Sequence, residues 1–294
     1  MSDFRQDTYL RGVVMIILSA FCFACMNVFV RLAGDMPSIQ KSFFRNLVAA
    51  VLAGTIIWKD HVSLEVKNEA RLSLFVRCFF GTIGILGNFY AVDHLLVADA
   101  SILNKLSPFF AIIFSYLLLK EEISFFQAVC VGTAFVGCLF VVKPGFENTV
   151  SIPALVGVCG GLGAGIAYTM VRKMGTMGVK GPVIVFYFSL FSCLAVVPWI
   201  VFHFTPMSLG QLGMLLLAGT CAAGGQFAIT KAYTYAPAKK ISIYDYSQII
   251  FATVLGYVMF GEIPDSLSFI GYTLIVAASL AMFLKVTCKR KNAC

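Results

Sequence analysis

Residues 13–30 form an apolar run in which only Asn27 is strongly polar. Its 18 residues are close to the roughly 20 that a helix needs to cross a hydrocarbon core about 30 Å thick. The apolar part of a secretory signal peptide is shorter, about 7 to 15 residues. We therefore expect residues 13–30 to be retained as a membrane-spanning helix.

Runs of this kind recur along the whole chain. Hydrophobic residues make up 60% of the sequence, charged residues 12%, and the mean hydropathy is +0.90, whereas soluble proteins have about 25% charged residues. Polar residues divide the apolar stretches into ten segments, which predicts an all-α integral membrane protein with ten transmembrane helices. The predicted helices cover residues 9–32, 37–58, 71–92, 99–119, 124–142, 153–172, 183–202, 209–235, 239–260 and 266–285.

Lysine and arginine residues gather on alternate connections between these segments. Because cytoplasmic connections carry the excess of positive charge, both the N- and the C-terminus are predicted to be cytoplasmic. The cytoplasmic residues are then Arg5, Arg11, Lys59, Lys67, Arg71, Lys120, Arg172, Lys173, Lys180, Lys239, Lys240, Lys285, Lys289, Arg290 and Lys291. The same bias explains the net charge of +8 and indicates contact with the headgroups of the lipid bilayer rather than with nucleic acid.

The two halves of the sequence resemble each other weakly. LSPFFAIIFSYLLLKEEIS and YSQIIFATVLGYVMFGEIP align at a shift of 140 residues, which places Ser107 on Ser247 and Glu122 on Glu262. Five helices per half is an odd number, so the second half should lie inverted relative to the first. We predict two five-helix repeats, residues 1–146 and 147–294, in one membrane domain. Inverted-repeat transporters bind their substrates near the midplane between the repeats.

Three sequence stretches carry a family resemblance. The chain resembles the EamA-like family of the drug/metabolite transporter superfamily in three stretches. These are FFRN in the second segment, RCFFGTIGILGNFYAV in the third, and ADASILNKLSPFFAIIFSYLLLKEEISFFQ across the fourth and fifth. The resemblance implies a carrier of small metabolites in a prokaryotic cytoplasmic membrane, with a central cavity between its halves. The chain departs from the family pattern at Gln248, where the second repeat often has proline, and in PVIVFYF, which lacks an arginine matching Arg45.

The fourth segment contains a lysine and a helix breaker. Pro108 has no N–H and its ring clashes with the carbonyl group four residues earlier, so the carbonyl group of Asn104 should be free beside Lys105. Transporter sites use such freed backbone groups where they line a cavity. The alternative is a kinked helix whose role is packing alone.

Lys105 and Asp245 occupy equivalent positions in the two halves. Lys105 either faces a cavity, as charged residues inside spans usually do, or extends its long side chain to the interface. Straight helices would separate the two side chains by about 12 Å in depth, so a direct ion pair between them is not expected. The partners expected by depth are Asp93 or Asp99 for the lysine, and Lys231 or Arg77 for the aspartate.

Further polar residues of the predicted membrane domain lie either at the depth of Lys105 or at the depth of Asp245. For any single amide the alternative is a hydrogen bond between helices, but their joint placement favours a cavity. The predicted substrate-binding residues are Asn27, Asn88, Asn104, Lys105, Pro108, Tyr168, Gln226, Asp245 and Gln248. GGLGAG, residues 160–165, has no preceding strand, so Gly161 and Gly165 indicate close helix packing rather than a phosphate-binding loop.

No motif in the chain indicates enzyme chemistry. HExxH, Walker A and GxSxG patterns do not occur in the sequence, and the CxxC spacing at Cys22 lies in mid-helix rather than in a redox fold. We expect no catalytic residue, metal or cofactor. The predicted function is secondary transport of amino acids or similar small polar metabolites, with protons or a counter-substrate as candidate coupled partners. The alternatives are a channel-like facilitator, a membrane-embedded enzyme and an assembly subunit.

Overall fold

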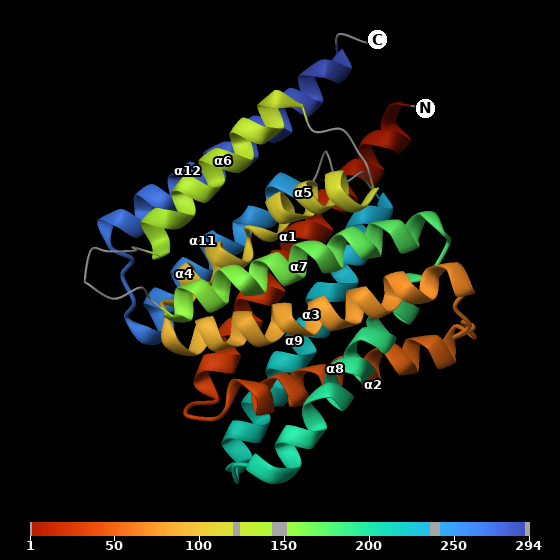
Figure 1. Ribbon diagram of the computed structural model, residues 1–294, viewed down its shortest axis with the longest axis vertical. Helices are drawn as coiled ribbons and strands as arrows, with labels where there is room; N and C mark the ends of the chain where they lie inside the picture. The colour runs from red at the N-terminus through yellow and green to blue at the C-terminus, as the bar shows by residue number, and fades with distance from the viewer. Residues whose placement is uncertain (1, 120–123, 143–151, 236–241, 292–294) are drawn as a thin grey trace.

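The regular structure of the chain is helical throughout the part described. The computed structural model describes residues 2–119, 124–142, 152–235 and 242–291 (Figure 1). Its elements are α1 (Ser2–Leu32), α2 (Ser38–Lys59), α3 (Asn68–His94), α4 (Val97–Asn104), α5 (Ser107–Leu119), α6 (Phe125–Val142), α7 (Ile152–Thr176), α8 (Gly181–His203), α9 (Leu209–Tyr235), the 3₁₀ helix η1 (Ser242–Tyr246), α11 (Ser247–Phe260) and α12 (Ser266–Lys291).

Each of the ten predicted segments contains at least one of these helices, so the all-helical prediction is confirmed. Six spans in the described part are long and apolar enough to cross a membrane: residues 10–32, 68–94, 97–118, 152–175, 181–203 and 209–229. The fourth of these combines α4 and α5. α2 contains the charged residues Lys41 and Arg45, and the apolar parts of α6 and α12 are shorter. The number of ten spans therefore stays a prediction.

The exterior of the bundle is apolar, unlike that of a soluble protein. Large apolar residues face outward, including Phe125, which is 86% exposed, and Trp58, which is 80% exposed. Polar residues such as Asn27 and Lys41 are each 1% exposed inside the bundle. An apolar exterior lowers the free energy of the protein in lipid rather than in water. The chain is therefore a multi-pass membrane protein.

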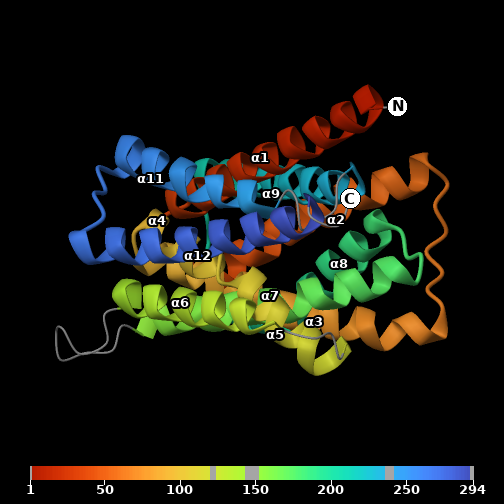
Figure 2. The same cartoon turned by 90° about the horizontal axis from the view of Figure 1, so that it is seen from above.

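The helices pack in pairs along a common direction. α6 and α12 run side by side at one edge of the bundle, and α2 and α8 lie together at the opposite edge (Figures 1 and 2). Between them α1 packs on α9, and α3 packs on α7. α4 packs on α11.

Glycines allow α7 to approach its neighbours closely. A Cβ atom on Gly161 would lie 2.7 Å from the carbonyl oxygen of Leu103, and one on Gly165 would lie 2.9 Å from that of Ser107. Backbone atoms cannot move aside as a flexible side chain can. The close packing predicted from the spacing of Gly161 and Gly165 is therefore confirmed.

Gly165→Ala should lower the free energy of unfolding by about 1–3 kcal/mol, the usual cost of overpacking a close contact. The added methyl group would meet Cβ of Phe110 at 2.5 Å as well as the backbone of Ser107. Gly132→Ala on α6 is the matched control, because nothing lies within 4 Å of its new Cβ. Thermal unfolding of both purified variants is the measurement. Equal melting temperatures would contradict the close contact between α7 and α5.

Candidate functional site

The fourth predicted span is interrupted near its centre. α4 ends at Asn104 and α5 begins at Ser107, so Lys105 and Leu106 connect the two helices. Pro108 lies in the first turn of α5, where a missing N–H costs no helical hydrogen bond. The predicted kink is thus a complete break in the helix, directly at the lysine.

A tyrosine of the ninth predicted segment covers backbone that this interruption leaves free. In that segment the 3₁₀ helix η1 ends at Tyr246 and passes directly into α11 at the next residue. The hydroxyl group of Tyr246 donates a hydrogen bond to the carbonyl oxygen of Lys105 at 3.1 Å. Tyr246 therefore satisfies a backbone group of the interrupted fourth span.

Lys105 and Asp245 form a buried ion pair at this crossing. The Nζ atom of Lys105 lies 2.5 Å from Oδ2 of Asp245. The two side chains are only 6% and 11% exposed. Within the described structure, Oδ1 of Asp245 is buried and has no hydrogen-bond partner. The aspartate therefore neutralises the lysine and keeps one oxygen free to accept a further hydrogen bond.

The expectation that Lys105 and Asp245 would not pair is wrong. It treated both spans as straight helices perpendicular to the membrane, whereas α4 packs on α11, the fourth span is interrupted at Lys105, and Asp245 lies in a 3₁₀ helix. The long side chain of Lys105 covers the remaining distance from its backbone to the carboxylate of Asp245. The partners expected for Lys105 are engaged elsewhere: Asp99 accepts a hydrogen bond from Tyr272 at 2.6 Å, and Asp93 pairs with a lysine of α2.

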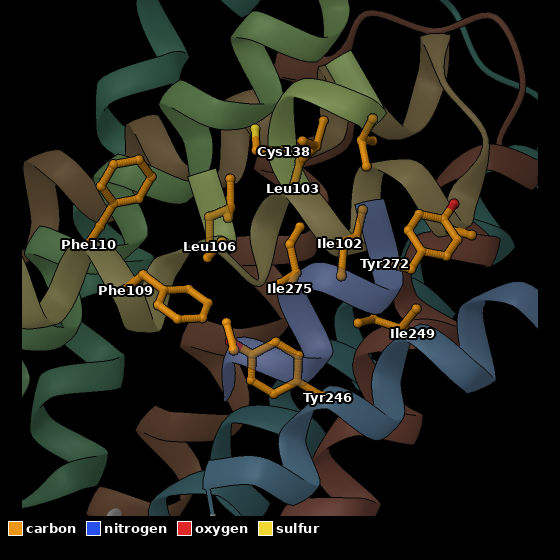
Figure 3. Packing of buried hydrophobic residues seen from close by; sticks show 14 of the residues in the cluster. Ile102, Leu103, Leu106, Phe109, Phe110, Cys138, Tyr246, Ile249, Tyr272 and Ile275 are labelled. Atoms are coloured by element: carbon orange, nitrogen blue, oxygen red, sulfur yellow. The ribbon is translucent and has the colours of Figure 1, made fainter. Parts of the chain in front are cut away.

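Apolar side chains surround the interruption. Figure 3 shows Leu103, Leu106 and Phe109 from the fourth span next to Tyr246 and Ile249 from the ninth. Residues of α6 and α12 complete this buried cluster: Cys138, Tyr272 and Ile275. Such a cluster excludes water from one side of the ion pair, which strengthens its electrostatic interactions.

A polar network joins α1, α3 and α4 at the depth predicted for Lys105. Nδ2 of Asn88 donates to Oδ1 of Asn27 at 3.2 Å, and Nδ2 of Asn27 donates to Ser101 at 3.2 Å. These residues come from α3, α1 and α4, and each is at most 7% exposed. The structure thus joins Asn27 and Asn88, while Ser101 was not identified from the sequence.

The other predicted substrate-binding residues come from four different elements. Gln248 is buried on α11, and Tyr168 on α7 and Gln226 on α9 are half-buried. Asn104 is half-buried at the end of α4. The side chain of Pro108 lies outside the described part of the structure. All four placed side chains contribute polar groups inside the bundle, and their role in substrate binding stays a prediction.

A second ion pair joins the elements at one end of the bundle, here called the Arg31 end. Gly261 has a positive φ of 67° and ends α11 in the left-handed conformation, which turns the chain so that Glu262 follows. Glu262 pairs with Arg31 of α1 and accepts the N–H of Val97, at the start of α4, at 2.8 Å. Arg31 also donates to the carbonyl oxygen of Leu95 at 2.7 Å. One carboxylate therefore connects α1, α4 and α11.

Two further connections lie at the Arg31 end. Lys41 of α2 is 2.5 Å from Oδ1 of Asp93 of α3, and Ser38 donates to the same carboxylate at 2.7 Å. Gln40 exchanges two hydrogen bonds with the backbone of Thr205, at 2.8 and 2.9 Å. Together with the Arg31–Glu262 pair, they hold the helices of this end against one another.

Two buried arginines were not predicted as site residues. Arg45 of α2 donates to Oδ1 of Asn46 at 2.6 Å. Arg77 of α3, an expected partner of Asp245, instead places its guanidinium carbon 3.9 Å from the centre of the Phe188 ring. Both lie inside predicted spans, so the argument applied to Lys105, that a charge in a span faces a cavity or partner, would have found them.

Metal chemistry has no candidate site in the described ranges. No group of three or more histidine, cysteine, aspartate or glutamate side chains there is placed to hold an ion. Eight cysteines in that part of the chain are free: Cys22, Cys25, Cys78, Cys130, Cys138, Cys159, Cys193 and Cys221. Cys22 and Cys25 are half-buried in α1, as expected for residues that serve in helix packing.

Comparison with known proteins identifies one family and several relatives. The profile of the EamA-like transporter family matches residues 10–143 and, separately, residues 151–284. The pseudopaline exporter CntI of Pseudomonas aeruginosa is 31% identical over 278 residues, which cover 94% of this chain and 97% of that protein. The riboflavin transporter of Vibrio cholerae is 26% identical and covers 91% of both chains. Solute carrier family 35 member G1 of Mus musculus is 28% identical, and the match covers 86% of this chain and 73% of the length of that protein.

The fold is also present among solved structures. A chain of known crystal structure is 15% identical, with a TM-score of 0.66 over 93% of this chain and 96% of that one. At this identity the likeness concerns the fold alone.

Proposed function

Because the chain belongs to the EamA-like transporter family, we propose that it is a secondary transporter that moves small polar metabolites across the cytoplasmic membrane by alternating access. The family and the named relatives are transporters rather than enzymes, in agreement with the sequence. The proposed substrates are amino acids or related compounds, with protons or a counter-substrate as coupled partners. The observation that carries the proposal is the buried pair of Lys105 and Asp245, which lies at the interruption of the fourth predicted span.

An arrangement of ten helices in two inverted repeats, residues 1–146 and 147–294, is part of the proposal. The two separate family matches support it. The packing supports it as well, because exchanging helices for their equivalents in the other half reproduces the main pairings. The pairing of α1 with α9 becomes that of α7 with α3, and α1 with α11 becomes α7 with α5.

The interrupted fourth span supports a substrate site at the centre of the bundle. Transporters with inverted repeats bind their cargo between the repeats, where broken helices present free backbone and side-chain groups. Lys105 comes from the first half and Asp245 from the second, so a substrate that contacts both would contact both moving parts. The free Oδ1 atom of Asp245 is one group that a substrate can engage.

The connections at the Arg31 end support alternating access. Under the positive-inside rule both termini are cytoplasmic, and the Arg31 end then faces outward. The Arg31–Glu262 and Lys41–Asp93 pairs would hold the outer side closed in this conformation. Their release would open the centre to the outside, as alternation between two access states requires.

The test is a binding screen followed by counterflow. A ligand that binds only the folded protein raises its stability by RT ln(1 + [L]/Kd), or about 2.7 kcal/mol at one hundred times Kd. The twenty amino acids and small dicarboxylates are screened by thermal shift, and labelled hits are exchanged into liposomes that contain the purified protein. We expect saturable counterflow that unlabelled hit competes. Flux without saturation or competition would instead indicate a channel, and turnover of lipid would indicate an enzyme.

A further inference from the structure

Two arginines lie inside the bundle without an acidic partner. Arg45 of α2 is 5% exposed and Arg77 of α3 is 4% exposed. In the part of the chain that the structure describes, neither guanidinium group belongs to an ion pair, and the Nε atom of each is buried without an acceptor. Charged groups inside membrane proteins normally pair with one another, with carbonyl groups or with a ligand. Both arginines therefore retain donors that the protein leaves unused.

Neighbouring groups hold the two guanidinium planes in place. Arg77 stacks on Phe188, with 3.9 Å from its guanidinium carbon to the ring centre. Gly81, one turn along the same helix, leaves room for this group, because a Cβ atom there would collide with Nη1 of Arg77. Arg45 is fixed by its bond to Asn46 at 2.6 Å. Donors that are fixed before a ligand arrives lose little conformational entropy on binding.

The helices that carry the arginines also pack around the site proposed above. Arg45 lies on α2 and Arg77 on α3, and both helices pack against α8, which supplies the Phe188 ring stacked on Arg77. α3 packs on α7, which carries Tyr168, and α7 packs on α4, which ends directly before Lys105. Lys105 and Asp245 neutralise each other. Within the described structure, the two guanidinium groups then add two positive charges that no acidic side chain pairs with.

We propose that Arg45 and Arg77 recognise acidic groups of the substrate, and that the transported compounds are small metabolites with two carboxylate groups. This inference rests on the proposed transport function and defines its substrate class. Guanidinium binds carboxylate through two parallel hydrogen bonds in a fixed geometry. A dianion would supply the acceptors that the buried donors lack and would balance the two charges.

Ligand binding to the purified full-length protein tests the substrate class. Thermal shifts are measured with malonate, succinate, glutarate, adipate, aspartate and glutamate, and with succinamide and putrescine as neutral and cationic controls of similar size. We expect at least one dicarboxylate to raise the melting temperature with saturation, while succinamide and putrescine leave it unchanged. Stabilisation by the neutral or cationic compounds alone, or by no dicarboxylate, would overturn the proposal.

Substitution of the arginines separates recognition from a structural role. Arg77→Gln and Arg45→Gln should each weaken dicarboxylate binding at least tenfold, and Arg77→Lys should weaken it less, because the charge remains but the two-pronged geometry is lost. Without ligand, the glutamine variants should melt no lower than the wild type, since each removes a buried charge that has no partner. Arg71→Gln, on the exposed first turn of α3, is the matched control and should bind normally.

The outcomes also distinguish this inference from the proposed transport function. Two results together would assign the arginines a structural role and overturn the inference. They are a lower melting temperature of both glutamine variants without ligand, and an unchanged dicarboxylate affinity in Arg77→Lys. Binding is measured in detergent without any transport step. Dicarboxylate binding without counterflow would therefore contradict the transport function only, and counterflow of neutral compounds alone would contradict the substrate class only.

Discussion

Lys105→Met should destabilise the protein by about 3–5 kcal/mol and abolish counterflow. The methionine side chain roughly keeps the length of lysine but leaves the carboxylate of Asp245 buried without its counter-charge, and removal of one member of a buried pair has a cost of this size. Asp245→Asn should have a similar effect, because it leaves the ammonium group of Lys105 unpaired at a site with 6% exposure. Thermal unfolding and counterflow in liposomes are the two measurements. Lys67→Met, at an exposed position, should change neither.

The double variant Lys105→Met/Asp245→Asn distinguishes a functional pair from a structural one. Removing both charges leaves no unpaired ion, so most of the lost stability should return. Transport should remain absent, because the groups proposed to contact the substrate from both halves are then missing. Counterflow at the wild-type rate in the double variant would show that the pair serves folding alone. Normal counterflow in either single variant would contradict the site itself.

Local sequence patterns were sufficient to predict the helices and some of their contacts. Apolar runs of membrane-spanning length place helices correctly because lipid requires backbone groups to be satisfied within each span. The GxxxG spacing of Gly161 and Gly165 predicts the close approach of α7 to the interrupted fourth span. Pro108 likewise marks the position of the break. These features depend on neighbours within about one or two turns of the chain.

The pairing of distant charges could not be predicted in the same way. A depth estimate treats Lys105 and Asp245 as points on straight helices, whereas their contact depends on the packing of α4 on α11, on the interruption of the fourth span and on the 3₁₀ helix that carries Asp245. Tyr246 became part of the site only because η1 faces the freed carbonyl group of Lys105. The direction of Glu262 depends on the left-handed conformation of Gly261. Each of these is a consequence of tertiary geometry, which one sequence does not encode in its periodicity.

Glu262→Gln should shift the protein toward a conformation in which the Arg31 end is open. Glutamine keeps the shape of the side chain but loses the charge that attracts Arg31 and that favours the N-terminal turn of α4, where Val97 donates its N–H. A charge-assisted hydrogen bond of this kind contributes about 1.5–3 kcal/mol, and 1.4 kcal/mol corresponds to a tenfold change in an equilibrium. We therefore expect the open conformation to become about ten times more populated.

A cysteine on α4, one turn after Val97 and thus near the Arg31–Glu262 pair, reports this opening. Ser101 is fully buried on α4, so Ser101→Cys in a background without native cysteines should react slowly with a polar thiol reagent in nanodiscs. Adding Glu262→Gln or Arg31→Gln should raise the reaction rate about tenfold, and combining both should add little, because each already breaks the same pair. Glu65→Gln, exposed between α2 and α3, is the control and should leave the rate unchanged. If neither variant at the Arg31–Glu262 pair accelerates labelling, that pair does not hold this end closed, and the proposed alternation needs another gate.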